Sequence, residues 1–152
     1  KKGGARRVVG FVHPESVLKD HESINLYKLF FSYAYSTGST VPPQIIYGKP
    51  GEISTETFLR IGPFQSSEEC KNCLTYMTGK FFRALLFFNR IAKNSSQQTF
   101  SLIPLLDFNK GWTDKELYQK YELTQSEIDF IEQQIKPMDN DSASADIDTD
   151  DE

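Results

Sequence analysis

Four short apolar runs in the first half of the chain carry the pattern of β-strands. Each is rich in β-branched or aromatic residues and ends near a Pro, a Gly or a Ser–Thr break. In the second run, Leu29, Phe31 and Tyr33 fall on one alternate face, although periodicity alone would also allow a helix there. The expected strands are Arg7–Val12, Leu26–Tyr35, Gln44–Tyr47 and Thr55–Ile61, the last closed by Gly62-Pro63.

The next part of the chain changes to apolar steps of three and four residues, which predict a helix. Ser66 and Glu69 have the spacing of a capping box, in which each residue bonds to the other's backbone N–H. From there the apolar steps continue to about Lys93, and after Lys80 they occupy most of the helix surface. We therefore expect one long helix that lies in the core.

Beyond the long helix we expect one short strand, Thr99–Leu102, and a pair of helices at the C-terminal end. Two further capping boxes, Thr113/Glu116 and Thr124/Glu127, start these helices, which run to about Tyr121 and about Ile135. The predicted fold is α+β: a small mixed or antiparallel sheet around one long central helix, followed by a C-terminal helical pair.

The charged residues divide the chain into a mildly basic body and an acidic tail. Residues 139–152 hold seven of the 21 acidic residues and a single large apolar residue, so we expect a disordered tail after one domain at residues 1–138. That domain has 14 acids against all 17 Lys and Arg, a net charge of +3; residues 1–110 carry +6 and residues 111–138 carry −3. A basic body is compatible with a polyanionic partner.

The N-terminal end and the cysteines indicate the setting in which the protein works. The chain begins with Lys1, and a strand-like run follows almost at once, which suggests a piece of a longer protein. It has no membrane-spanning stretch and no secretory signal. Cys70 and Cys73 could form half of a zinc site or a redox pair, but no second pair exists, so two reduced thiols at a helix start are favoured. We expect a cytoplasmic protein.

Enzyme motifs are sparse in this sequence. A nucleophile elbow, a zinc-protease motif and a phosphate-binding loop are all missing from it. Glu69-Cys70-Lys71 spells the E-x-K of metal-dependent nucleases, but it has no convincing acidic partner upstream. Glu52 and Glu56 are better explained as part of a solvated face that pairs with Lys49 or Arg60.

Six short motifs of the chain form a recognisable set. They are T-E-T-F-L at Thr55–Leu59, G-P-F at Gly62–Phe64, K-F-F-R at Lys80–Arg83, P-L-x-D-F at Pro104–Phe108, W-T-D-x-E-L-Y at Trp112–Tyr118 and I-K-P-M at Ile135–Met138. Each motif alone is weak, but the set is specific. Together they resemble the C-terminal part of restriction–modification DNA methyltransferases of the adenine-N6 class. The resemblance covers roughly residues 6 to 138, and the run YKLFFSYAYSTG also fits it.

The resemblance implies target recognition without catalysis. In such enzymes the amino-terminal domain binds S-adenosylmethionine and carries the catalytic N-P-P-[YF] motif. Here Val41-Pro42-Pro43-Gln44 lacks both the Asn that holds the target amino group and the aromatic that stacks on the flipped base. This chain is therefore expected to bind no cofactor and to have no catalytic residue of its own. By resemblance it grips double-stranded DNA and presents the adenine to the catalytic methyltransferase domain of the same polypeptide.

Basic, amide and hydroxyl side chains supply the candidate DNA contacts, because amides and guanidinium groups read base edges while lysines and hydroxyls hold phosphates. Taken alone, these residues are better explained as ordinary solvated charge, and Arg83 among phenylalanines is better explained as an internal pair. The candidate phosphate contacts are Lys49, Lys80, Arg90, Lys93 and Lys110, and the candidate base contacts are Asn94, Gln97 and the Ser36–Thr40 loop with Ser36, Thr37 and Ser39.

Two other functions stay open on the sequence alone. One is the nuclease part of a fused restriction–modification enzyme, which would use Glu69-Cys70-Lys71 or Glu52 and Glu56. The other is a protein-interaction module that docks through the acidic helical pair at residues 113–136.

Overall fold

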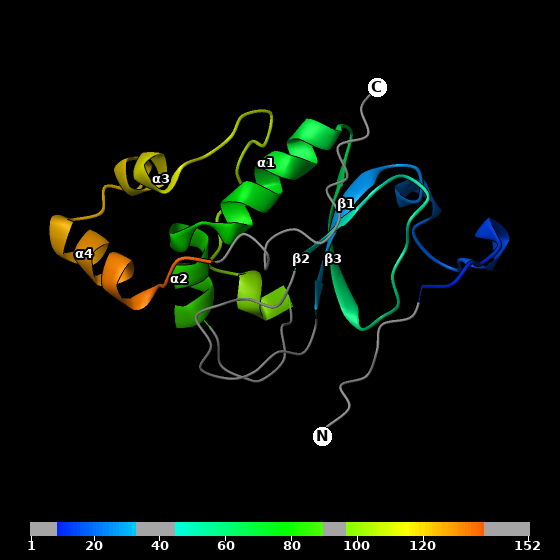
Figure 1. The fold of residues 1–152 in the computed structure, drawn as a ribbon, viewed down its shortest axis with the longest axis horizontal. Helices are drawn as coiled ribbons and strands as arrows, with labels where there is room; N and C mark the ends of the chain where they lie inside the picture. Colours follow the sequence, from blue (N-terminus) through cyan, green and yellow to red (C-terminus); the bar gives the residue numbers. More distant parts are fainter. Residues whose placement is uncertain (1–8, 33–44, 90–96, 139–152) are drawn as a thin grey trace, which may run out of the picture.

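The computed structural model describes residues 9–32, 45–89 and 97–138. They form an α+β fold with a three-stranded antiparallel sheet in the order β2-β1-β3 (Figure 1). The strands are β1 (Tyr27–Ser32), β2 (Ile45–Gly48) and β3 (Phe58–Phe64). The α-helices are α1 (Ser67–Thr78), α2 (Lys80–Phe88), α3 (Asp114–Lys120) and α4 (Gln125–Gln134), and the short 3-10 helices are η1 (Pro14–Ser16), η2 (His21–Ser23) and η3 (Gln97–Phe100).

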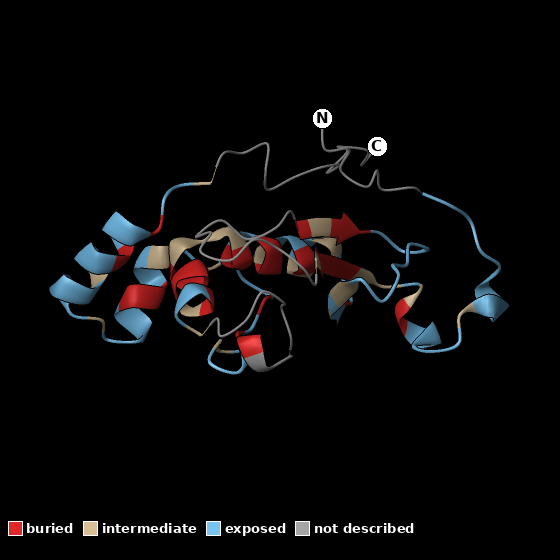
Figure 2. Cartoon of the chain, turned by 90° about the horizontal axis from the view of Figure 1, so that it is seen from below, coloured by how far each residue is buried: buried red, intermediate tan, exposed pale blue. Residues whose placement is uncertain are grey.

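The central strand β1 places Leu29 and Phe31 of the predicted strand on one face, while Tyr33–Tyr35 lie outside the described residues. Leu29 and Phe31 are fully buried against the helix layer, in which α1 lies across the sheet. On the opposite face Lys28 and Phe30 are also buried, so this strand is covered on both sides. Figure 2 shows the buried residues gathered in the sheet and in the helices next to it, whereas the surface of α4 is mostly exposed.

The predicted long helix is wrong, because α1 and α2 are separate helices that meet at Gly79. The backbone of Gly79 is extended there, and the carboxylate of Asp114 accepts the N–H groups of Lys80 at 2.9 Å and Phe81 at 2.8 Å. These are unsatisfied donors of the first turn of α2, so a residue 34 positions away caps a new helix. The predicted N-cap Ser66 is confirmed and accepts from the Glu69 N–H, although the Glu69 carboxylate bonds to the N–H of Gln65 instead.

Three of the strand predictions need correction. Residues 9–12 of the predicted Arg7–Val12 strand are not in a strand, and within the described ranges no strand lies beside them to form a ladder. The predicted Thr99–Leu102 strand is wrong as well, because the 3-10 helix η3 occupies residues 97–100. The predicted Thr55–Ile61 strand corresponds to β3, which begins three residues later, at Phe58. Gly62-Pro63 does not end this strand, because β3 continues through both residues to Phe64. Its pairing with β1 has a register irregularity opposite Tyr27/Leu29.

The C-terminal helical pair is confirmed with its caps. Thr113 and Glu116 form a reciprocal capping box at α3, and Thr124 and Glu127 form another at α4. The pair packs against α2, where the rings of Phe81 and Tyr121 stack with their centroids 5.2 Å apart. No helix in the described part of the chain is long and apolar enough to cross a membrane.

Candidate functional site

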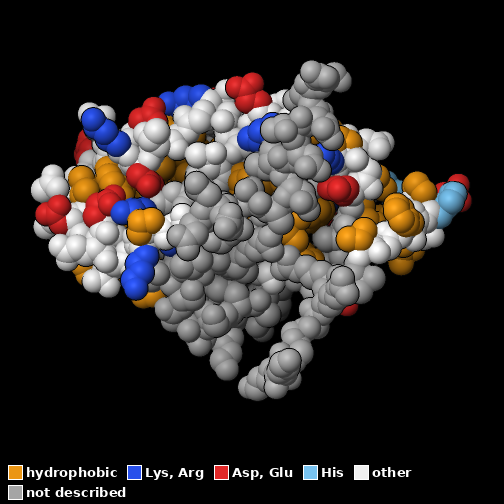
Figure 3. Space-filling model, in the orientation of Figure 1, with side chains coloured by type: hydrophobic (Ala, Val, Ile, Leu, Met, Phe, Trp, Pro, Cys, Tyr) orange, Lys and Arg blue, Asp and Glu red, His pale blue; other side chains and the backbone are white. Residues whose placement is uncertain are grey.

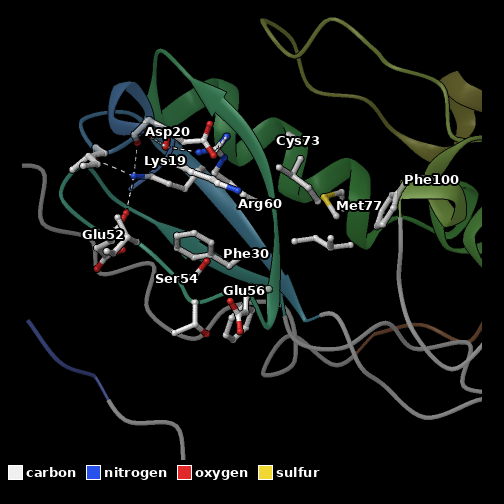
Figure 4. Close-up of a pocket in the computed structure, with 18 of the residues that line it drawn as sticks. Lys19, Asp20, Phe30, Glu52, Ser54, Glu56, Arg60, Cys73, Met77 and Phe100 are labelled. Carbon is white, nitrogen blue, oxygen red and sulfur yellow. Dashed lines mark hydrogen bonds and ion pairs between the residues drawn. The ribbon is translucent and has the colours of Figure 1, made fainter. Parts of the chain in front are cut away.

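A pocket of about 1060 Å³ lies at the outer edge of the sheet. Its walls come from residues 12–24, the loop at 52–58, strand β3, helix α1 and the segment 100–108. Figure 4 shows Asp20, Glu52 and Arg60 at one end and Cys73, Met77 and Phe100 toward the other. The pocket therefore has a polar end and an apolar end.

The buried side chain of Lys28 bonds to the loops that form the polar end of the pocket. Its side chain is 1% exposed, and its ammonium donates to the carbonyl oxygens of Ser23 and Glu52, both at 2.8 Å, and of Ile24 at 3.0 Å. Burial lowers the pKa of this ammonium, against the opposing effect of Glu52. Since all three donors are used within the fold, Lys28 ties β1 to two loops and has none left for a ligand.

Arg60 on β3 reaches the same loops. Its guanidinium donates to the hydroxyl of Ser23 and pairs with the Asp20 carboxylate at 3.5 Å. Asp20 itself has a left-handed backbone, with φ of 59°, and its carbonyl oxygen accepts the hydroxyl of Ser23 at 2.8 Å. The sequence analysis missed this cluster. The signal that could have found it is a lysine and an arginine on the same face of two otherwise apolar strands.

The apolar end wraps around the free edge of β3. Leu59 and Ile61 pair across the sheet with Phe31 and Leu29, so their side chains share the helix face, while Arg60 pairs with Phe30 on the opposite face. Residues on both sides of β3 line the pocket. A segment bound along this edge would thus contact Leu59 and Ile61 on the helix face of the sheet and Arg60 on the opposite face.

The C-x-x-C lies in the wall of α1 and is chemically quiet. Both thiols are free and buried. Burial raises the pKa of the Cys70 thiol to about 12 and raises that of Cys73 as well, so neither forms a thiolate readily. Within the described ranges, no three His, Cys, Asp or Glu side chains come together as a possible metal site.

Two acidic residues of the nuclease hypothesis bond to nearby backbone groups. The Glu69 carboxylate accepts the N–H of Gln65, and Cys70 between it and Lys71 is buried. Glu52 accepts the backbone N–H of Lys49 at 2.7 Å, as a loop-closing contact. The expected partner of Arg60 is also different, since it pairs with Asp20.

Three of the candidate lysines lie in different surroundings. Lys49 is exposed in the turn after β2, and Lys80 forms an ion pair with Glu132. The ammonium of Lys110 lies 3.7 Å from the ring centroid of Trp112 and 3.8 Å from Glu116. The structure does not bring these three residues together. Arg83 is an internal residue, as expected: it is buried and donates to the carbonyl oxygen of Lys136 at 2.7 Å.

The remaining candidates fall on segments whose neighbours can still be located. The residues Ser36, Thr37, Ser39, Arg90, Lys93 and Asn94 lie outside the described residues, as do the side chain of Gln97 and the acidic tail at 139–152. The stretch 33–44 connects β1 to β2, where Phe31 pairs with Ile45. The stretch 90–96 connects α2 to η3, where Asn89 donates to the carbonyl oxygen of Thr99 at 3.0 Å.

The described residues that flank 33–44 lie close to those that flank 90–96. The ring of Phe31, at the end of β1, meets the ring of Phe100, at the end of η3, edge to face with centroids 5.4 Å apart. Both stretches therefore start and finish at the same end of the sheet. Lys49 lies at the opposite end of β2, where it follows Gly48, the residue that pairs with Lys28.

Comparison with known proteins adds no relative. The chain matches no protein-family model, no curated protein and no solved structure.

Proposed function

We propose that this chain is the DNA target-recognition domain of an adenine-N6 methyltransferase of a restriction–modification system. In this role it binds double-stranded DNA and presents an adenine to a catalytic domain of the same polypeptide, which would bind S-adenosylmethionine. The single observation that carries the proposal is that the residues flanking 33–44 and those flanking 90–96 lie at the same end of the sheet. These stretches hold the candidate base contacts except Gln97, which directly follows the second stretch, and the contact between Phe31 and Phe100 brings the described residues that flank them to one end of the sheet.

The motifs of the resemblance support a division of labour between frame and reading segments. Asp114 of W-T-D-x-E-L-Y caps α2 at Lys80 and Phe81 of K-F-F-R. Phe108 of P-L-x-D-F packs edge to face on Phe64 of G-P-F, with ring centroids 6.1 Å apart. The shared residues thus hold one another in place. Recognition would then fall to segments that the frame carries, which is a common arrangement for binding loops.

The position of the positive charge supports one of these two segments, residues 90–96, and adds residues 1–8. The described ranges hold 11 basic and 14 acidic residues, so they are net acidic. Residues 1–8 contain four bases and no acid, and residues 90–96 contain Arg90 and Lys93 and no acid. The +6 of residues 1–110 therefore comes from these two stretches alone. A phosphate backbone would be drawn to them rather than to the helical pair.

Binding of the full chain to DNA over a salt series tests the proposal. We expect fluorescence anisotropy to show binding of residues 1–152 to labelled random-sequence 30-base-pair duplexes. Arg90→Ala with Lys93→Ala should lower the slope of log affinity against log salt by about 1.8, since each lost phosphate contact removes about 0.9. Replacing Asn94 or Gln97 should instead cost about 1–3 kcal/mol on the preferred sequence only.

The control is the pair Lys19→Ala and Lys71→Ala, which removes the same charge from positions that are not candidate contacts. It should leave the slope near that of the unchanged chain. Equal slopes for the two double variants would mean that only total charge matters, and the proposed face would be wrong. An unchanged chain that fails to bind duplex DNA at low salt would overturn the proposal itself.

A further inference from the structure

The first described residues form an apolar segment without neighbours. Val9 is 89% exposed and Phe11 is 101% exposed, and Val12 is exposed as well. In an extended chain Val9 and Phe11 point to one side, while Gly10 and Val12 point to the other. Large side chains with this alternation usually lie in a sheet that buries one face, so their exposure in this arrangement calls for a partner.

Strand β3 has a matching free edge. Its inner edge pairs with β1, and no strand among the described residues pairs with its outer edge. An unpaired edge carries a row of backbone donors and acceptors that readily accepts another strand. Natural sheets shield such edges with charge, proline or a covering segment. Along Leu59–Ile61, only Arg60 is charged, and its guanidinium is already held by Asp20 and Ser23.

The pocket extends from this edge to the apolar segment. Val12 forms part of its wall, so the segment leads directly into the pocket. Two other large apolar side chains of the wall also face solvent, Leu18 at 92% and Leu105 at 91% exposure. Figure 3 shows hydrophobic side chains crowded at the right of the molecule, beside the pale-blue histidine, where Figure 1 places the N-terminal segment. The segment and the pocket wall thus meet at Val12.

We propose that Val9–Val12 closes onto the outer edge of β3 as a fourth strand and fills the apolar end of the pocket. Four extended residues span about 13 Å, and Val12 already lies at the wall. Val9 and Phe11 would enter on the helix face beside Leu59 and Ile61, between Met77 and Leu105. Gly10 would lie on the opposite face, where its missing side chain leaves room for Arg60.

This closure does not rest on the proposed function, because it concerns contacts within the chain and requires no DNA. A second copy of the chain would offer the same apolar segment to the β3 edge. We favour the segment of the same chain because it is joined to the pocket wall, so its local concentration is high at any protein concentration.

Amide hydrogen exchange by NMR on the full chain, without DNA, tests the proposal. In the unchanged protein we expect protection of the outward-facing amides within Leu59–Ile61 and nuclear Overhauser contacts from the Phe11 ring to the Met77 methyl group. Phe11→Asp should increase the exchange of those amides at least tenfold and remove the contacts. Leu102→Asp, which changes an exposed leucine outside the pocket wall, should leave both measurements unchanged.

The experiment also separates the other outcomes. If the Phe11 contacts are missing in the unchanged chain, or if Phe11→Asp leaves the exchange of the β3 amides as it was, the closure does not occur. Protection that grows between 20 µM and 1 mM protein would identify a second copy as the occupant and would overturn the proposal. If Phe11→Asp disturbs the whole spectrum, Val9→Asp provides the same comparison at the other inward position.

Discussion

At the scale of single residues, one carboxylate determines where two helices divide. Asp114 accepts two N–H groups at the start of α2, and its Oδ1 lies 2.9 Å from the place where a Cβ on Gly79 would be. Any larger residue at position 79 would push against that carboxylate or against the Tyr76 carbonyl, 3.2 Å away. The Asp114 carboxylate therefore both starts α2 at Lys80 and leaves no room for a side chain at position 79.

We expect Asp114→Ala to destabilise the fold by about 1–2 kcal/mol, the range for a lost N-cap. Asp114→Asn should cost less, because the amide oxygen still accepts one of the two N–H groups. Urea unfolding followed by circular dichroism measures both variants. Asp129→Ala is the control, since that carboxylate on α4 has only an exposed bond to Gln125. Equal stability of the Asp114→Ala and Asp129→Ala proteins would show that the cap is not needed.

At the scale of elements, the sequence predicted those strands and helix starts that depend on residues close to one another in the chain. The strands β1 and β2 and the caps of α3 and α4 depend on neighbouring residues, and the sequence predicted all of them. The split between α1 and α2 depends on Asp114, which lies far along the chain, so periodicity alone predicted one helix. Residues 97–100 form η3 where Phe100 packs on Phe31 and Phe82, a tertiary contact that outweighs strand propensity.

The helical pair is tied to α2 by Glu132, which accepts from Lys80 and, at 3.0 Å, from the hydroxyl of Tyr118. The bond from Lys80 lowers the pKa of Glu132 below its ordinary value. The unfolded chain therefore binds the proton more tightly, and this contribution to stability is present above the unfolded pKa of about 4.3 and lost as pH falls below it.

We accordingly expect Glu132→Gln to be less stable than the unchanged protein at pH 7, and the gap between them to narrow as pH falls below about 4. Urea midpoints at pH 7, 5 and 3.5 give the comparison. Asp129→Asn removes a carboxylate from the same helix without touching Lys80, and it serves as the control. A gap that stays constant with pH would mean that the ion pair does not contribute to stability.

At the scale of the whole molecule, the sequence predicted components of the candidate site but not their assembly. The helix start that carries both cysteines was predictable from the Ser66 cap, but their burial was not. The three carbonyls around Lys28 come from two loops distant in sequence, and no motif indicates such a cage. The same holds for the shared end of residues 33–44 and 90–96, which depends on the packing of Phe31 against Phe100.

The charge distribution of the whole chain yields a prediction for its acidic end. Deleting residues 139–152, with their seven acids, should leave the melting temperature unchanged and tighten DNA binding at low salt. The difference should vanish at high salt, since the competition is electrostatic. A full-length control with Asn and Gln in place of the seven acids separates charge from length. An affinity that neither change alters would mean that the tail never approaches the DNA face.

The paired roots of residues 33–44 and 90–96 also bear on how such a protein could diversify. Phe31 and Ile45 hold the ends of one stretch in register, and the bond between Asn89 and Thr99 holds the ends of the other. With the ends fixed by the frame, doubling the length of either stretch would add only about 0.6 kcal/mol of closure entropy. Under the proposed function, replacing either stretch as a cassette would let one scaffold acquire new specificities while its core stays untouched.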